Sequence, residues 1–108
     1  MRAGYVFRNG ILAGTITEVH RRLFVFRYDD RYFLDPELPA VSLTLPKSRQ
    51  EYVSEYLFPF FANMLSEGAN RKLQSNHWKV DENDHFSFLL ITAQADTVGA
   101  VTVKPVRV

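Results

Sequence analysis

The opening of the chain alternates apolar and polar residues in the way that β-strands do. Residues 2–8 and 11–19 form two such segments, and only Asn9 and Gly10 separate them. The pair Asn-Gly supplies the two positive-φ positions that a tight type I′ turn requires. The pattern therefore predicts an antiparallel hairpin at the start of the chain.

A third strand is predicted over residues 20–28, because apolar side chains occupy both of its faces. Its aromatic face consists of Phe24, Phe26 and Tyr28. We expect Asp29-Asp30 to turn the chain and residues 31–40, which two prolines interrupt, to form a loop. Residues 41–46 alternate again, so a short strand that ends at Pro46 is predicted.

The middle of the chain changes to the helical period. Apolar residues recur there at intervals of three and four, which places them on one side of a helix. They are Leu57, Phe60, Phe61, Met64 and Leu65. Pro59 suits the first turn, where its missing amide hydrogen is not needed, so we predict a start near Tyr56. Gly68 suits the left-handed residue that ends a helix.

Two further helices and a last strand are predicted downstream. Residues 70–78 fit a short helix with Asn70 as its N-cap, and Asp84 is a good N-cap for another. The buried face of the latter helix is expected to contain Phe86, Leu89, Leu90 and Ala93. Residues 97–105 alternate as a strand that Lys104-Pro105 closes.

The order of these segments determines the expected fold class. Strands come first, helices follow, and one strand ends the chain, which is typical of α+β proteins. We predict a mainly antiparallel sheet of about five strands with two or three helices packed on it. A chain of 108 residues has the size of one domain, so residues 1–108 are expected to form a single domain.

Composition narrows the classes of function. The net charge is +1, which gives no overall field to attract nucleic acid or an anionic membrane. Cysteine is absent, which removes thiolate zinc sites and thiol nucleophiles and fits a reducing cytoplasm. The longest apolar run, residues 88–91, is too short to cross a bilayer. We expect a cytoplasmic protein in which some of the aromatic residues, 14% of the chain, face a partner.

Catalytic and metal-binding motifs are missing from the sequence. The histidines, His20, His77 and His85, lack the paired spacing that would hold a metal. Residues 81–84 resemble the start of a calcium loop, but the glycine and the closing glutamate that such a loop needs are absent. No glycine-rich phosphate loop or activated-serine motif occurs. We therefore expect no enzyme activity, no metal and no cofactor.

Basic residues leave nucleic-acid binding open as an alternative. Arg21, Arg22, Arg27 and Arg31 cluster in sequence around the third predicted strand, where aromatic residues alternate with them. Aromatic and basic residues on one sheet could stack on single-stranded nucleic acid. At a net charge near zero, a solvated charged face of an antiparallel sheet is the better interpretation. Direct nucleic-acid binding is therefore not expected.

Three segments form a pattern of known order and spacing. They are residues 41–46 (VSLTLP), 58–68 (FPFFANMLSEG) and 97–105 (TVGAVTVKP). Together with the Asn-Gly hairpin, they resemble the N-terminal domain of the bacterial HipA-type serine/threonine kinases. The resemblance covers almost the whole chain and departs from the family at Ser66, where a proline is common.

The resemblance implies a function through a partner. In the split HipBST arrangement of that family, this domain is a separate HipS-like antitoxin beside a HipT-like serine/threonine kinase. The implied role is to bind and inhibit that kinase by protein–protein contact, with a HipB-like DNA-binding protein in the same complex. A structural subunit that completes or stabilises the kinase without inhibiting it is the alternative. We expect the chain to be a free-standing gene product.

The predicted kinase-binding segment is the polar loop after the first helix. It consists of Ser66, Glu67, Gly68, Ala69, Asn70 and Arg71. Loops on a rigid scaffold often carry function, although a helix cap with surface charges explains the same residues equally well. Trp78 is a second candidate anchor, because tryptophan is enriched at interface hot spots. Burial of Trp78 against the sheet is the favoured interpretation.

Overall fold

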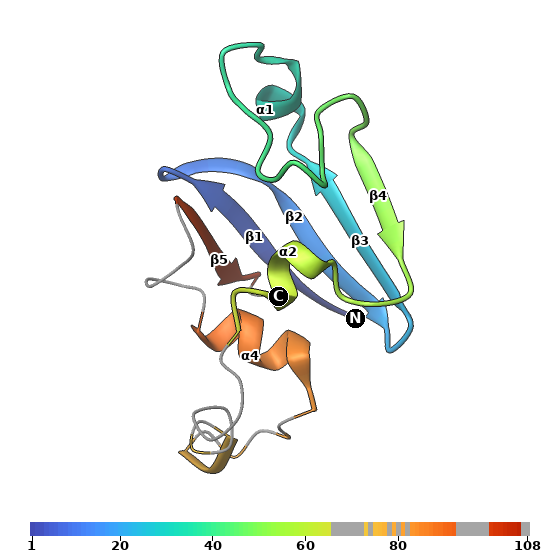
Figure 1. Cartoon of the computed structure of the whole chain (residues 1–108), viewed down its shortest axis with the longest axis vertical. Coiled ribbons are helices and arrows are strands. Elements are labelled where there is room, and N and C mark those ends of the chain that lie inside the picture. Colours follow the sequence, from blue (N-terminus) through green and yellow to red (C-terminus); the bar gives the residue numbers. More distant parts are fainter. Residues whose placement is uncertain are drawn as a thin grey trace.

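The computed structural model describes residues 1–65, 73, 75–77, 79, 81, 83–92 and 100–106. They build a five-stranded sheet in the order β4-β3-β2-β1-β5, in which every neighbouring pair is antiparallel (Figure 1). The strands are β1 (Arg2–Arg8), β2 (Ile11–His20), β3 (Leu23–Tyr28), β4 (Glu51–Ser54) and β5 (Val101–Pro105). An antiparallel sheet with short helices confirms the predicted α+β class.

β1 and β2 form the predicted hairpin. Asn9 has a φ of 51° and Gly10 a φ of 79°, which are the positive values that a type I′ turn requires. The last strand, β5, pairs with the other side of β1, and the Val106 N–H donates to the Ala3 carbonyl at 2.9 Å. The first and last strands of the described chain are therefore neighbours in the sheet.

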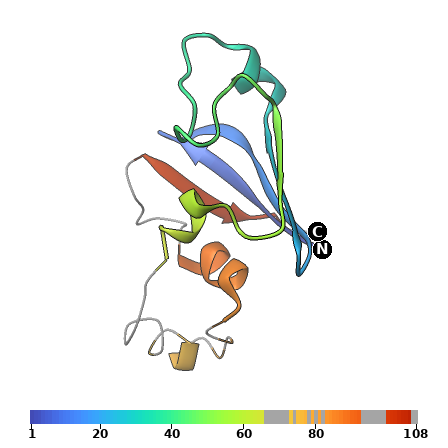
Figure 2. The ribbon, with the colours of Figure 1, turned by 45° about the vertical axis from the view of Figure 1, so that its right-hand side comes forward.

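One face of the sheet carries the core. α2 (Pro59–Ala62) and α4 (His85–Thr92) lie on this side, whereas α1 (Asp30–Leu34) sits at one end of the sheet (Figure 1, Figure 2). Alternate strand residues meet apolar residues of the helices between the two layers. The buried residues include Val6, Ile16, Phe24, Phe26, Tyr28, Phe61, Phe86, Phe88, Leu89 and Val103.

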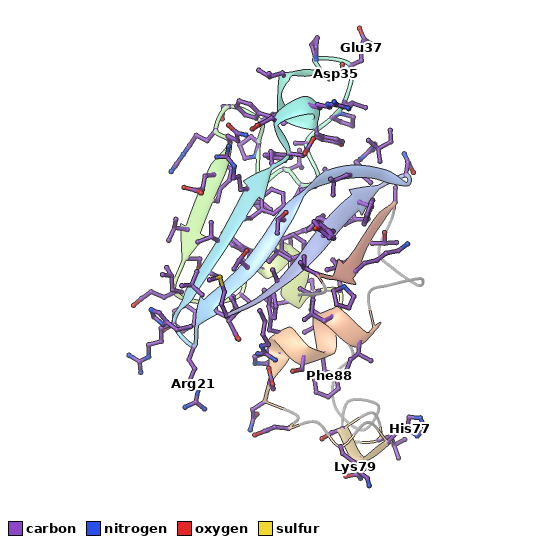
Figure 3. The ribbon with its side chains drawn as sticks, turned by 180° about the vertical axis from the view of Figure 1, so that it is seen from behind. Arg21, Asp35, Glu37, His77, Lys79 and Phe88 are labelled. Atoms are coloured by element: carbon purple, nitrogen blue, oxygen red, sulfur yellow. The ribbon has the colours of Figure 1, made fainter. Side chains whose placement is uncertain are left out.

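The opposite face of the sheet has no helix over it in the described part of the chain, as Figure 3 shows from behind. Strand register places on this open face Ala3, Tyr5, Phe7, Thr15, Thr17, Val25, Arg27, Glu51, Val53, Thr102 and Lys104. The Nζ atom of Lys104 lies 5.5 Å from the centroid of the Phe7 ring, as expected for two residues that share a face. The sheet is packed on one side and solvated on the other.

The segment predicted as a loop over residues 31–40 begins with a helix. The Asp29 carboxylate accepts hydrogen bonds from the N–H groups of Arg31 (3.1 Å) and Tyr32 (3.4 Å), and so caps α1. Asp29 thus starts a helix, as aspartate at an N-cap does, and the prediction of a turn and loop was wrong here. Tyr32 is buried and stacks on Tyr28, with ring centroids 5.9 Å apart.

Residues 41–46 form turns and not the predicted strand. The Tyr28 hydroxyl accepts a hydrogen bond from the Val41 N–H at 3.1 Å and donates one to the Leu45 carbonyl. These two backbone groups are thus bonded by a side chain, in place of the partner strand that a β-strand would need. Burial raises the pKa of Tyr28 to about 12, which keeps this hydroxyl protonated. β3 pairs with β2 on one side and with β4 on the other, and the sequence did not predict β4.

α2 is shorter than predicted. Pro59 occupies the first helical position, as expected, but Phe58 is the N-cap, so a start near Tyr56 was wrong. The helix ends at Ala62, and Gly68 lies outside the described residues. Of the predicted apolar stripe, Leu57, Phe61 and Leu65 are buried, and Phe60 and Met64 are partly buried.

Asp84 caps α4, as predicted. Its Oδ1 atom accepts a hydrogen bond from the Ser87 N–H at 3.2 Å. Of the four residues expected on the buried face, Phe86 and Leu89 are buried, Leu90 is partly buried, and Ala93 lies outside the described residues. The sequence did not single out Phe88, which is fully buried.

The remaining predicted elements are described only in part. Within the helix predicted over residues 70–78, residues 73 and 75–77 are helical, and Asn70 lies outside the described residues. The last strand begins at Val101, and the start of its predicted range, residues 97–99, also lies outside them.

Candidate functional site

The predicted kinase-binding segment, residues 66–71, lies outside the described residues, and so does Trp78. Both therefore stay predictions. The described chain reaches Leu65 on one side of this region and resumes continuously at residue 83 on the other. Among the described residues, charged side chains gather near the start of α4.

The clearest polar arrangement is the Arg2 cluster, formed by Arg2, Glu18, Asp84 and Ser87. Nε of Arg2 donates to Glu18 Oε1 at 2.9 Å. The two terminal nitrogens of Arg2 donate to the two carboxylate oxygens of Asp84 at 2.9 and 3.2 Å, and one of them also donates to Ser87 Oγ. Arg2 starts β1 and Glu18 lies in β2, so the cluster joins the start of α4 to two strands.

The cluster keeps its charges ionised. The hydrogen bond to Asp84 raises the pKa of Arg2, although partial burial opposes this. Burial alone would raise the pKa of Asp84, but hydrogen bonds from Arg2 and Ser87 outweigh it and lower that pKa below its usual value. The Arg2 guanidinium also lies 5.3 Å from the centroid of the Phe86 ring. Mutual pairing of these groups suits a structural role, in which the cluster fixes α4 against the sheet.

Replacing Asp84 by asparagine should reveal this role through pH. Asparagine can still cap a helix, but it removes the charge that binds Arg2. We expect a loss of about 1 kcal/mol in the free energy of unfolding at neutral pH, since the pair is partly exposed. The pKa of Asp84 is lower in the folded state than in the unfolded state, so its charge stabilises the fold at pH values above the unfolded-state pKa. This stabilisation is lost as the pH falls through the folded-state pKa of Asp84.

The stability difference between the two proteins should therefore shrink below about pH 4, near the ordinary pKa of aspartate. Urea unfolding at a series of pH values measures it. Asp81→Asn is the matched control, because Asp81 is exposed and lies outside the Arg2 cluster. A difference that stays constant from pH 7 to the acid limit would show that the Asp84 charge does not stabilise the fold.

A groove of about 480 Å³ opens beside the Arg2 cluster, where the turn between β2 and β3 comes close to the segment before α4. Figure 3 shows Arg21 on that turn, at the same end of the sheet as α4. The groove is lined by Arg2, Glu18, Arg21, Phe24, Glu55, Tyr56, Leu57, Ala62, Asp81, Asn83, Asp84, His85 and Phe86.

The groove combines apolar residues with a charged rim. Phe24, Leu57 and Phe86 are buried and contribute apolar atoms to its lining. Among the described residues, every ion pair that lines the groove involves Arg2. Arg21 and Glu55 therefore carry charges that are not in an ion pair. Apolar surface surrounded by charge is the usual anatomy of a protein-binding surface.

The basic residues considered for nucleic-acid binding do not gather in one place. Arg21 and Arg22 occupy the turn before β3, whereas Arg27 lies near the other end of that strand. Arg27 pairs with Asp30 at 3.1 Å, and Arg21 lines a groove that contains four carboxylates. The described structure therefore does not support a basic surface for stacking nucleic acid.

The described residues contain neither a cluster of metal ligands nor a membrane-spanning helix. Within this part of the chain, no group of three or more His, Asp or Glu side chains could hold a metal ion. The same residues contain no helix that is long and apolar enough to cross a membrane.

Comparison with known proteins identifies the family. The family model of the HipA N-terminal domain matches residues 4–104. The chain belongs to the HipA N-terminal domain family. An uncharacterized protein of Haemophilus influenzae is 35% identical over 104 residues, which cover 96% of this chain and 92% of that protein.

The HipA N-terminal domain also occurs within longer proteins. A candidate kinase of Sinorhizobium fredii is 29% identical over 97 residues, which cover 84% of this chain but only 24% of that protein. The solved N-terminal domain of HipA toxin matches with a TM-score of 0.75 at 29% identity, covering 99% of this chain and 94% of that one. The family model and the solved structure both concern the N-terminal domain of HipA.

The structure also shows which functional features of this HipA N-terminal domain the sequence did not reveal. The capping role of Asp84 was visible as a helix-start signal. Its pairing with Arg2 was not, because 82 positions separate the two residues. The groove is lined by residues from the β2–β3 turn, the segment after β4 and the start of α4, so no local motif predicted it.

Proposed function

We propose that this HipA N-terminal domain protein is a HipS-like antitoxin, which binds and inhibits a separate HipA-like (HipT) serine/threonine kinase. One observation carries the proposal. The same domain makes up nearly all of the Haemophilus relative but about a quarter of the candidate kinase of Sinorhizobium. A domain that occurs both on a kinase chain and largely by itself is suited to act on a kinase in trans.

The proposed action requires only binding and no catalysis. A stable interface of standard size buries about 800 Å² on each partner and centres on aromatic or arginine residues. The groove offers Tyr56, which is 76% exposed, and the unpaired Arg21. The segment at residues 66–71 connects α2 to the region that leads into α4, so we propose that segment and groove contact the kinase together. The complex would act in the cytoplasm, with a HipB-like DNA-binding protein as a further partner.

The direct test uses a HipT-like kinase, the partner that the proposal requires. The purified chain and kinase should elute together in size-exclusion chromatography, and kinase autophosphorylation should fall as the chain is added. Separate elution together with unchanged autophosphorylation would refute the proposed inhibition.

Charge reversals should locate the contact. The double variant Glu67→Arg with Arg71→Glu, and separately Asp81→Arg in the groove, should weaken kinase binding by about tenfold or more, because like charges would then face each other. Thermal unfolding of each variant should stay near that of the unmodified chain. Glu37→Arg, at an exposed position near α1 at the other end of the sheet, is the matched control (Figure 3). Unchanged affinity in both test variants would place the contact elsewhere.

A second candidate function is completion of the kinase fold without inhibition. The Sinorhizobium protein favours it, since the domain there belongs to the same chain as the rest of the candidate kinase. In that case, adding the chain should maintain or raise kinase activity while the two proteins still elute together. Activity measured in the same titration therefore separates the two functions.

A further inference from the structure

The two edges of the sheet differ in how they are protected against pairing. The edge strand β5 carries Lys104 and Pro105, a charged residue and a residue without an N–H, which both discourage a further strand. The other edge strand, β4, has the sequence Glu-Tyr-Val-Ser, with neither proline nor lysine. β4 lies at the outer margin of the sheet with β3 as its neighbour (Figure 1). Its outer side is therefore the edge that could accept a strand.

Hydrogen bonding within the sheet determines which groups of β4 face outward. The Tyr28 N–H donates to the Gln50 carbonyl at 2.8 Å, so Gln50 points toward β3. Alternate residues of an antiparallel strand point to the same side, so Tyr52 and Ser54 also bond to β3. The backbone N–H and C=O groups of Glu51 and Val53 consequently point away from the sheet.

The other side of β3 supports this assignment. The Asp29 N–H donates to the Ala13 carbonyl at 2.8 Å, so the odd-numbered residues of β3 bond to β2 and the even-numbered ones remain for β4. Val53 is 62% exposed, and no interaction recorded among the described residues occupies its outer backbone groups. The edge is therefore accessible as well as correctly oriented.

We propose that two copies of this chain pair through their β4 edges, antiparallel to each other, to form one continuous sheet across a two-fold axis. A two-fold axis is the usual symmetry of a homodimer, and an axis perpendicular to the sheet makes the two edge strands antiparallel. The two strands can form hydrogen bonds only if residues whose backbone groups point outward, Glu51 and Val53, lie opposite such residues in the second copy. Possible registers therefore differ from one another by steps of two residues. This inference is independent of the proposed function.

Charge selects one of these registers. With Tyr52 opposite Tyr52 of the second copy, Glu51 lies opposite Val53 within the paired strands. Arg49 and Glu55 flank β4 on its two sides, so each end of the pairing brings an arginine of one copy near a glutamate of the other. A shift of the strands by two residues in either direction places Glu51 opposite Glu51 or opposite Glu55, which is repulsive. Arg49 and Glu55 are both exposed, and the Arg49 guanidinium lies 5.1 Å from the centroid of the Tyr52 ring. No ion pair among the described residues involves either side chain, so both charges can pair across the edge.

The pairing is expected to be weak, because four-residue strands bury far less than the roughly 1,600 Å² of a standard interface. Sedimentation velocity of the full chain over a wide concentration range is the test. The weight-average sedimentation coefficient should rise with concentration from the monomer value toward the dimer value. A constant monomer value up to the solubility limit would refute the proposal.

Variants at the edge test the register. Val53→Pro removes an outward N–H that the β3–β4 pairing does not use, and it should abolish self-association. Arg49→Glu and Glu55→Arg should each weaken it by about tenfold, since two charge pairs become repulsive in every dimer. The double variant Arg49→Glu with Glu55→Arg should restore it, because the opposite charges face each other again.

Controls keep these outcomes interpretable. Circular dichroism should show that each variant is folded, and the charge variants decide the question if Val53→Pro does not fold. Lys104→Glu reverses a charge on the opposite edge strand and should leave self-association unchanged. Self-association that ignores the β4 variants but responds to Lys104→Glu would place the contact at β5 and overturn the proposal.

Discussion

Replacing Phe26 by alanine is expected to lower the free energy of unfolding by about 3–5 kcal/mol. Phe26 is fully buried in β3. Its ring meets the Tyr28 ring edge-on, with centroids 4.9 Å apart, and lies 5.8 Å from the ring of Phe61 in α2. Removing it leaves a cavity between the sheet and α2 that the surrounding rings cannot fill. Chemical denaturation followed by circular dichroism measures the loss.

Tyr56→Ala is the matched control, because it also removes an aromatic ring but from a side chain that is 76% exposed. It should change the free energy of unfolding by less than about 1 kcal/mol. If both substitutions had the same small effect, Phe26 would not be the centre of the contact between the sheet and α2.

The hairpin could be predicted from sequence because its information is local. Asn9-Gly10 has few alternatives to a type I′ turn, and the flanking alternation fixes the strands. β3 was likewise predictable from its three aromatic residues on one face, all of which are buried. The Asp84 cap also needs only its own neighbours, and it was predicted correctly.

The fourth strand was placed wrongly because residues 41–46 have a strand pattern but no strand partner. The Tyr28 hydroxyl binds the backbone of Val41 and Leu45, and this contact is remote in sequence. Conversely, β4 has only four residues, and two of them face solvent, so its pattern is weak. Pairing with β3 makes it a strand, and pairing is a tertiary property.

Helix length was also decided outside the local pattern. The apolar stripe from Leu57 to Leu65 fits a helix of several turns, yet α2 covers only Pro59–Ala62. Leu57 and Phe58 are buried although neither is helical, so residues before the proline reach the core without helical geometry. Apolar periodicity identified the residues that pack, but not the conformation in which they pack.

The Arg2 cluster was not predicted from the sequence, because it too depends on contacts between distant residues. Arg2 and Glu18 come from the first two strands and Asp84 from the start of α4, and all three line the groove. Each alone is an ordinary surface charge in the sequence. Partners separated by 16 and 82 positions have no local signal, so the Arg2 cluster required the structure.

Replacing Gly14 by alanine is expected to have the second largest effect, a loss of about 3 kcal/mol. A Cβ atom on Gly14 would lie 2.4 Å from the carbonyl oxygen of Arg27 and 3.1 Å from a ring carbon of Phe26. The nearest atom belongs to the backbone of the paired strand β3, so it cannot move aside without disturbing the centre of the sheet. Denaturant unfolding measures the loss.

Gly4→Ala is the matched control within the same sheet. A Cβ atom at Gly4 would lie 2.8 Å from Leu90 Cδ2 and from Val103 Cγ1, which are the ends of side chains. Leu90 is only partly buried and can adopt another rotamer, but Val103 is fully buried and has to shift, so we expect a loss of about 2 kcal/mol, smaller than at Gly14. Equal losses in the two variants would mean that β2 and β3 can separate locally at Gly14. The close approach of their backbones would then contribute little to the stability of the sheet.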